Sequence, residues 1–220
     1  MDVENQGQAT LNIGEFAALF LTLQSDINQI YPFEEHADSN QARYPDPTYL
    51  LPGARRGLVR ATFAFIEGNS YFLRQILLRS WGDKLPAATR LALAETQIEV
   101  NSQGNVKTKP LRSGATSMLR LTIETFISIF PNVLNVRCAG PSFESLTRSV
   151  RVRDRLMHPK SAAALMVTDQ ETRDIVEAFH WFSSVMVDII KASNRALKDQ
   201  LQQEFGIEVS LVFERKQPSN

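Results

Sequence analysis

The longest helical pattern in the chain is TDQETRDIVEAFHWFSSVMVDIIKASNRALKDQLQQEF, residues 168 to 205. Thr168 and Glu171 stand three residues apart at its start, which is the spacing of a capping box. In that motif each side chain accepts a hydrogen bond from the backbone N–H of the other residue. We therefore predict one helix over the whole stretch, and its apolar stripe must be buried against further helices.

Other parts of the chain repeat apolar residues at intervals of three and four, which is typical of amphipathic helices. The stretch after Pro141 is predicted to form a helix with Ser142 as its N-cap. A shorter helix is predicted to begin at Pro86, because proline is favoured in the first turn. The predicted helices cover residues 13–31, 58–81, 86–94, 116–130 and 141–157.

Three stretches do not follow a helical period. Residues 96–110 alternate apolar and polar side chains around Asn-Ser-Gln-Gly, which predicts a small β-hairpin or a flap. Residues 32–53 are rich in proline and polar side chains, which predicts a long loop with at most a short helical turn. The segment GIEVSLVFE, residues 206–214, is either an edge strand on the hairpin or a tail.

Long amphipathic segments joined by loops predict an all-α fold, an antiparallel helical bundle with a small β-hairpin or flap insertion. We expect the bundle to occupy residues 55–205. Residues 1–54 would supply an N-terminal helix and a long loop that pack on it, and residues 206–220 a C-terminal strand or tail.

Composition excludes several classes of protein. The 220 residues carry 24 basic and 24 acidic side chains, so no global field attracts nucleic acid or an anionic membrane. Cys138 is the single cysteine, which excludes an internal disulfide framework and a cysteine-based metal cluster within one chain. The first residues, MDVENQGQATLN, do not read as a secretory signal, and no apolar run is long enough to span a bilayer. We expect a cytoplasmic protein that does not bind membranes.

A cationic stretch near the end of one predicted helix contains the candidate functional residues. It reads RSVRVRDRLMHPK, residues 148 to 160. On a helix Asp154 and His158 lie on one face, whereas Arg153 lies roughly 140° from His158. Pro159 disfavours helical backbone at His158, so the helix is predicted to end there with the imidazole on a turn. A long arginine side chain then reaches the same cavity as the histidine.

The sequence Arg153-Asp154-x-x-x-His158, followed by Pro159 and a long helix, resembles the R-x4-6-H motif of HEPN domains. A polar residue directly after the arginine belongs to that family's usual pattern. The resemblance is close over the motif and looser over the order of helices between residues 55 and 205. It implies a metal-independent endoribonuclease whose active site forms at the interface of a homodimer, with no cofactor.

The resemblance also implies roles for the motif residues. His158 and its symmetry mate would act as base and acid when a ribose 2′-OH attacks the adjacent phosphate. Arg153 would bind the phosphate and Asp154 would orient His158. The neighbouring cations would form an RNA-binding patch, and two polar residues in an otherwise apolar stretch would line the cleft. These are Arg148, Arg151, Arg155 and Lys160 for the patch, and Glu67 and Asn69 for the cleft.

Two other functions stay open on the sequence. The first is a non-catalytic member of the family that binds a nucleotide or RNA, or that serves a nucleotidyltransferase as its partner. The second is a helical scaffold that binds a partner, in which Arg151, Asp154 and Arg155 form an ordinary surface ladder of ion pairs. A ribonuclease of this family would be expected to act as a toxin, with an antitoxin as partner, or in defence against foreign nucleic acid.

The remaining residues with chemical potential are interpreted as structural. His36 lies in a polar loop among acidic residues, without the spacing of a known metal motif. His180 follows the apolar pattern of the long helix, and Cys138 has no histidine near it in sequence.

Overall fold

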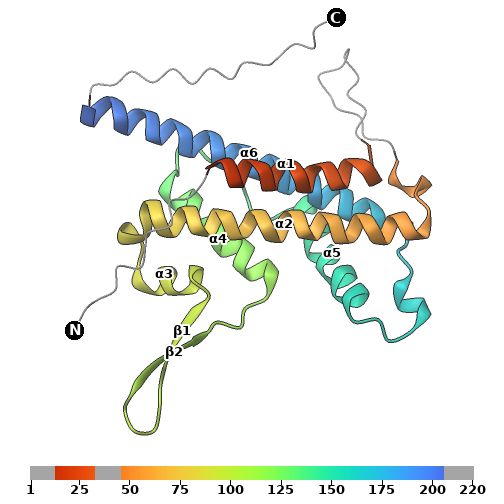
Figure 1. The fold of residues 1–220 in the computed structure, drawn as a ribbon, viewed down its shortest axis with the longest axis horizontal. Helices are drawn as coiled ribbons and strands as arrows, with labels where there is room; N and C mark the ends of the chain where they lie inside the picture. The colour runs from red at the N-terminus through yellow and green to blue at the C-terminus, as the bar shows by residue number, and fades with distance from the viewer. Residues whose placement is uncertain (1–12, 33–45, 206–220) are drawn as a thin grey trace, which may run out of the picture.

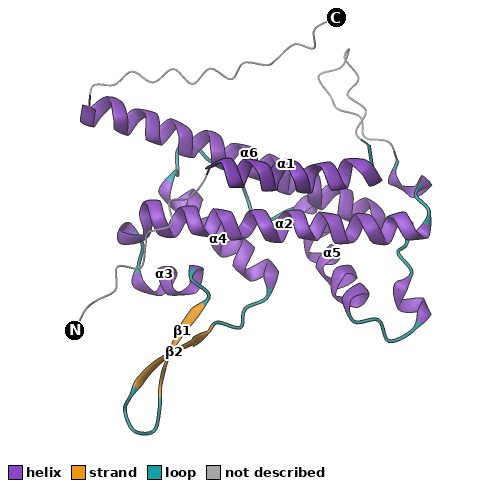
Figure 2. Cartoon of the chain, in the orientation of Figure 1, coloured by secondary structure: helices purple, strands orange, loops and turns teal. Residues whose placement is uncertain are grey.

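The computed structural model describes residues 13–32 and 46–205. Most of these residues are helical (Figures 1 and 2). The helices include short 3-10 turns, labelled η, and the described ranges also contain one pair of β-strands. In chain order the elements are α1 (Ile13–Ile30), η1 (Pro47–Tyr49), α2 (Pro52–Trp81), η2 (Gly82–Lys84), α3 (Ala87–Leu93), β1 (Thr96–Val100), β2 (Val106–Pro110), α4 (Ala115–Ile129), α5 (Pro141–Met157), η3 (Ala162–Leu165) and α6 (Asp169–Phe205).

Helix α2 lies at the centre of the bundle and contacts α1, α4, α5 and α6. Its Phe65 is 0% exposed. The Phe65 ring lies 5.2 Å from the ring of Phe20 in α1, and 5.1 Å and 5.9 Å from those of Phe179 and Phe182 in α6. Tilted and edge-to-face pairs at these distances are favourable beyond the area that they bury. One side chain of α2 therefore holds both long neighbouring helices.

The helices of the bundle do not all alternate in direction. Helix α1 runs antiparallel to α2, since the Phe16 ring packs on Phe72, whereas a Cβ on Gly57 would meet Ile30 at 3.4 Å. Helices α5 and α6 are also antiparallel. Helices α2 and α6, however, run parallel: Arg55 pairs with Asp169 near the start of both, and aromatic contacts follow further along each. The predicted antiparallel order thus holds for two helix pairs, and the segment from α3 to α5 returns the chain to the starting end of α2.

The predicted hairpin is confirmed. Strands β1 and β2 are antiparallel, with Ile98 opposite Thr108 and Val100 opposite Val106. The Asn101 side chain accepts hydrogen bonds from two backbone N–H groups of the turn, and Gly104 adopts the positive φ of 78° that the turn requires. The hairpin extends away from the helices below α3 (Figure 1).

Two helix starts differ from the sequence-based predictions. Helix α2 begins at Pro52, six residues before the predicted start, because proline fits the first helical position even though no apolar pattern has begun. The start therefore lies before the predicted domain boundary at residue 54. Helix α5 begins at Pro141 with Gly140 as its N-cap, so the prediction of Ser142 as N-cap is wrong. The Ser142 hydroxyl instead donates a hydrogen bond to Glu177 at 2.5 Å.

The predicted capping box of the last helix is confirmed. The N–H of Thr168 donates to Glu171 Oε2 at 2.9 Å, and the N–H of Glu171 donates to Thr168 Oγ1 at 3.3 Å. The predicted loop of residues 32–53 contains η1 and the start of α2, and its part from 33 to 45 lies outside the described residues, as does the predicted strand or tail of 206–214. No helix in the described ranges combines the length and the apolar character needed to cross a bilayer.

The central position of Phe65 gives a first prediction. Replacing Phe65 with alanine leaves a cavity between three helices, so we expect the free energy of unfolding to fall by about 3–5 kcal/mol. Urea unfolding followed by circular dichroism measures this change. Leu21→Ala in α1 is the control, because Leu21 is 63% exposed and we expect a change within about 0.5 kcal/mol. Equal losses in the two variants would contradict the central role of Phe65.

Candidate functional site

The predicted end of α5 is confirmed. The helix stops at Met157, and His158 caps it with non-helical backbone, φ −129° and ψ 60°. The backbone N–H of His158 still donates to the carbonyl oxygen of Asp154 at 3.1 Å. The imidazole is exposed and makes no hydrogen bond or ion pair with another described residue. A histidine is thus presented at the surface, at the point where Pro159 stops the helix.

Arg153 lies between two carboxylates. Its Nη2 is 2.6 Å from Glu67 Oε1 on α2, and its Nη1 is 3.0 Å from Asp154 Oδ1. The carboxylate of Asp154 therefore contacts Arg153. Among the described contacts, Asp154 meets His158 only through its backbone carbonyl, and not through the side chain that was expected to orient the imidazole. The side chain of Arg153 is one-third exposed and lies at the edge of the α2–α5 contact.

Two of the predicted phosphate-binding arginines join α5 to α6. Arg148 donates Nε and Nη2 to the two carboxylate oxygens of Asp174, each at 2.8 Å. Arg155 donates Nη1 and Nη2 to the two oxygens of Glu171, at 2.9 and 3.0 Å. Both are bidentate pairs, the strongest form of this interaction. Each arginine thus uses two of its N–H donors to hold α5 on α6, which gives both a structural role.

These pairs lower the pKa of both acids. Hydrogen bonds from Arg148 hold the pKa of Asp174 below its ordinary value, against the opposing effect of burial. Burial by itself raises the pKa of Glu171, but hydrogen bonds from Arg155 and from the Thr168 N–H outweigh it, and the net shift is downward. Both carboxylates are therefore charged in the folded protein at neutral pH.

The other two predicted phosphate-binding cations are exposed. Arg151 and Lys160 make no ion pair with a described residue. Arg151 and His158 are seven residues apart, which is close to two helical turns, so their Cα atoms lie on the same side of α5 although the backbone of His158 is no longer helical. Arg151, Arg153, His158 and Lys160 lie in the last turns of α5 or directly after it, and we call them the α5 terminal surface. Within this set Arg153 faces Glu67 on α2, on a different side of the helix from Arg151 and His158.

The two predicted cleft-lining residues have different environments. Glu67 pairs with Arg153 and lines a cavity. Asn69 is fully buried, and its Nδ2 donates to the carbonyl oxygen of Phe65 at 2.7 Å. Its Oδ1 has no hydrogen-bond partner among the described residues. Asn69 is thus a polar residue of the core, on the side of α2 away from that cavity.

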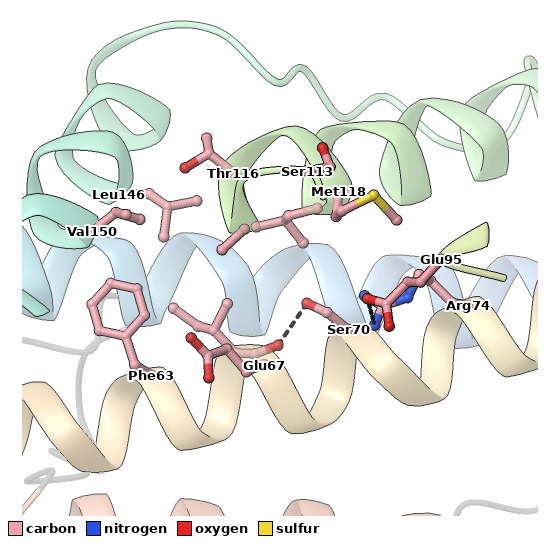
Figure 3. A pocket seen from close by; sticks show the side chains of 13 residues that line it. Phe63, Glu67, Ser70, Arg74, Glu95, Ser113, Thr116, Met118, Leu146 and Val150 are labelled. Carbon is pink, nitrogen blue, oxygen red and sulfur yellow. Dashed lines mark hydrogen bonds and ion pairs between the residues drawn. The ribbon is translucent and has the colours of Figure 1, made fainter. Parts of the chain in front are cut away.

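The cavity lies between α2, α4 and α5 and has a volume of about 310 Å³ (Figure 3). Sequence reasoning did not find it. A signal was present, because Phe63, Glu67, Ser70 and Arg74 recur at helical spacing and put three polar side chains on one stripe of α2. Only the packing of α4 and α5 over that stripe turns it into a cavity.

Comparison of the chain with protein-family models, curated proteins and solved structures gives no match. The site is therefore interpreted from its own geometry. Among the described residues, no group of three or more histidine, cysteine, aspartate or glutamate side chains is placed to hold a metal ion.

Of the other candidate residues Cys138 is buried, His180 is half-buried, and His36 lies outside the described ranges. Burial lowers the pKa of His180 to about 4, so the ring is neutral at neutral pH. Burial raises the pKa of Cys138 to about 11, so the thiol is protonated and is a poor nucleophile.

The α5–α6 ion pairs give a second prediction. Asp174 is buried, its side chain being 6% exposed, and its replacement by asparagine removes the charge that Arg148 binds. We expect the free energy of unfolding at pH 7 to fall by about 1–3 kcal/mol. Asp188→Asn is the matched control, an exposed aspartate in the same helix, with an expected change below about 0.5 kcal/mol.

The pH dependence follows from the direction of the shift. A carboxylate with a lowered pKa in the fold stabilises the protein above its ordinary pKa, about 3.9, and loses this effect as pH falls through the folded value. Wild type and Asp174→Asn should therefore converge in stability as pH falls below about 4. Urea unfolding at a series of pH values measures this, and a constant difference across the series would contradict the role of Asp174.

Proposed function

We propose that the protein is a metal-independent endoribonuclease of the HEPN type that acts as a homodimer. The observation that carries the proposal is the α5 terminal surface. It presents the exposed His158 with the exposed cations Arg151 and Lys160 at the end of a helix whose Arg148 and Arg155 are paired internally. The predicted all-α bundle and hairpin are consistent with this proposal, which otherwise rests on the resemblance of the motif.

The proposed reaction uses the residue types of this surface. His158 takes the proton of a ribose 2′-OH, whose oxygen attacks the adjacent phosphorus. The bond to the 5′-oxygen breaks, and His158 of the second copy gives that oxygen a proton. The products are a 2′,3′-cyclic phosphate and a free 5′-OH, so no metal or redox partner is needed.

Arg153 is the proposed phosphate ligand. Its two ion pairs use two of the five guanidinium N–H donors, and three remain for phosphate oxygens. Glu67 and Asp154 then act as positioning residues that hold the planar guanidinium in one orientation. Arg151 and Lys160 supply further contacts to the RNA backbone.

The wider setting is part of the proposal. A cytoplasmic location agrees with a chain that has one cysteine, Cys138. A role as toxin or in defence, with an antitoxin or a nucleotidyltransferase as partner, rests on the resemblance alone.

A non-catalytic helical module is the second candidate function, and one observation favours it. Arg148, Arg153 and Arg155 are all paired with carboxylates inside the chain. Such pairs are also what a scaffold uses to hold α5 against α2 and α6. In that case the α5 terminal surface binds a nucleotide, RNA or a protein partner without cleaving it.

Incubation of the full chain with a mixed RNA in EDTA tests the proposal. We expect cleavage that survives the chelator and leaves 2′,3′-cyclic phosphate ends. His158→Ala and Arg153→Ala should each reduce the rate by at least about 100-fold, the usual contribution of a general acid–base group or of a charge-stabilising donor.

Arg79→Ala is the control for surface charge. Arg79 is an exposed arginine in the last turn of α2, about 18 Å further along that helix than Glu67, and its loss should leave the rate unchanged. Thermal unfolding of each variant checks that it is folded. Absence of cleavage by folded, dimeric protein would overturn the ribonuclease proposal and favour the non-catalytic module.

A further inference from the structure

The cavity between α2, α4 and α5 has apolar walls. Phe63 and Ile66 of α2, Leu119 of α4, and Leu146 and Val150 of α5 line it. Its volume of about 310 Å³ is at the lower end of the range of small-molecule sites. It therefore suits a single ring system better than a long chain or a bare ion.

Hydrogen-bonding groups stand around these walls (Figure 3). The Ser70 hydroxyl donates to the carbonyl of Ile66 at 2.6 Å, which leaves its oxygen free to accept. The Thr116 hydroxyl makes no hydrogen bond with a described residue. Arg74, with a side chain only 10% exposed, uses Nη2 for Glu95 at 3.0 Å and has further N–H donors.

The first turn of α4 adds backbone donors. Gly114, its N-cap, has no side chain, and the first backbone bond of the helix runs from Met118 N–H to Gly114 oxygen. The N–H groups of Ala115, Thr116 and Ser117 therefore have no acceptor within the helix. Ala115 and Thr116 belong to the cavity lining, so backbone N–H donors stand at this side of a cavity that the carboxylates of Glu67 and Glu95 also line.

The cavity lies directly beside the proposed phosphate ligand. Leu146 and Val150 occupy the stripe of α5 that reaches Arg153 one turn later. Glu67 lines the cavity and binds Arg153 at 2.6 Å. A group in the cavity is thus one side chain away from the guanidinium that would hold the cleaved phosphate.

We propose that the cavity receives a nucleobase of the RNA strand next to the cleaved phosphate, and that it selects guanine or uracil. A base has apolar faces and polar edges, which match the walls and the surrounding groups. On their Watson–Crick edges guanine and uracil present a carbonyl that accepts from N–H donors beside a ring N–H that can donate to the Ser70 oxygen, whereas adenine and cytosine present an amino donor beside an acceptor nitrogen. This inference rests on the proposed function, because that function makes RNA the occupant.

Binding of single nucleotides tests the cavity without any cleavage. Guanosine, uridine and adenosine monophosphates are titrated into the full chain and followed by NMR. We expect guanosine or uridine monophosphate to bind more tightly than adenosine monophosphate. Thr116→Val and Ser70→Ala should each weaken this preference about three- to tenfold, the effect of one lost hydrogen bond.

Thr125→Val is the matched control. Thr125 is buried in the same helix, bonds to the Leu121 carbonyl and does not line the cavity, so its loss should leave base preference unchanged. In a parallel arm the ends of RNA fragments cut by each variant are sequenced. Cleavage should occur next to guanine or uracil, and Thr116→Val should relax that preference.

The outcomes separate the two proposals. Selective nucleotide binding without cleavage of any RNA would support the base site and overturn the ribonuclease. Cleavage without base preference, or with a preference that Thr116→Val and Ser70→Ala leave intact, would overturn the base site alone. Failure of all three nucleotides to bind at millimolar concentration would also overturn the base site.

Discussion

Helix α2 has to be covered on several sides at once, and the rest of the structure depends on this requirement. Phe65 contacts aromatic rings of both α1 and α6 and is fully buried between them. A helix with apolar residues on more than one face is stable only inside a bundle. The covering helices α1, α4, α5 and α6 are therefore arranged around α2, and each later feature of the site is a consequence of how they meet it.

The second determinant is electrostatic and fixes α5 on α6. Arg148 and Arg155 form bidentate pairs with Asp174 and Glu171, from two different turns of α5. Two attachment points fix the rotation of α5 about its own axis as well as its position. That rotation directs Arg153 towards Glu67 on α2. The arginines of this one stretch thus have two roles. Arg148 and Arg155 hold α5 on α6, whereas Arg151 and Arg153 belong to the α5 terminal surface.

The same rotation joins the surface to the cavity. Val150 lines the cavity, while Arg153, one turn later, reaches Glu67 at its edge. A second ion pair, Arg74 with Glu95, stands two turns further along α2. The proposed phosphate ligand, Arg153, and a ring-sized apolar pocket therefore share one wall through Glu67, which is an arrangement that suits a nucleotide.

The sequence by itself determined the elements whose signals are local. Pro159 ended α5 at His158, and Thr168 with Glu171 began α6, because a proline ring and a capping box act within one helical turn. The hairpin was likewise readable from alternation around a short turn. The start of α2 at Pro52 was not predicted, because an apolar stripe marks where a helix is buried and not where it begins.

Tertiary structure alone decided which partner each side chain meets. Glu67 binds Arg153 across two helices, whereas Asn69, two residues away, lies in the core. The sequence also did not predict that α2 and α6 run parallel. Nor did it predict that Arg148 pairs with Asp174 and Arg155 with Glu171. The physical reason is that an ion pair or a cavity requires two distant segments at a distance of a few ångströms, and helical periodicity specifies only which face of each segment is apolar.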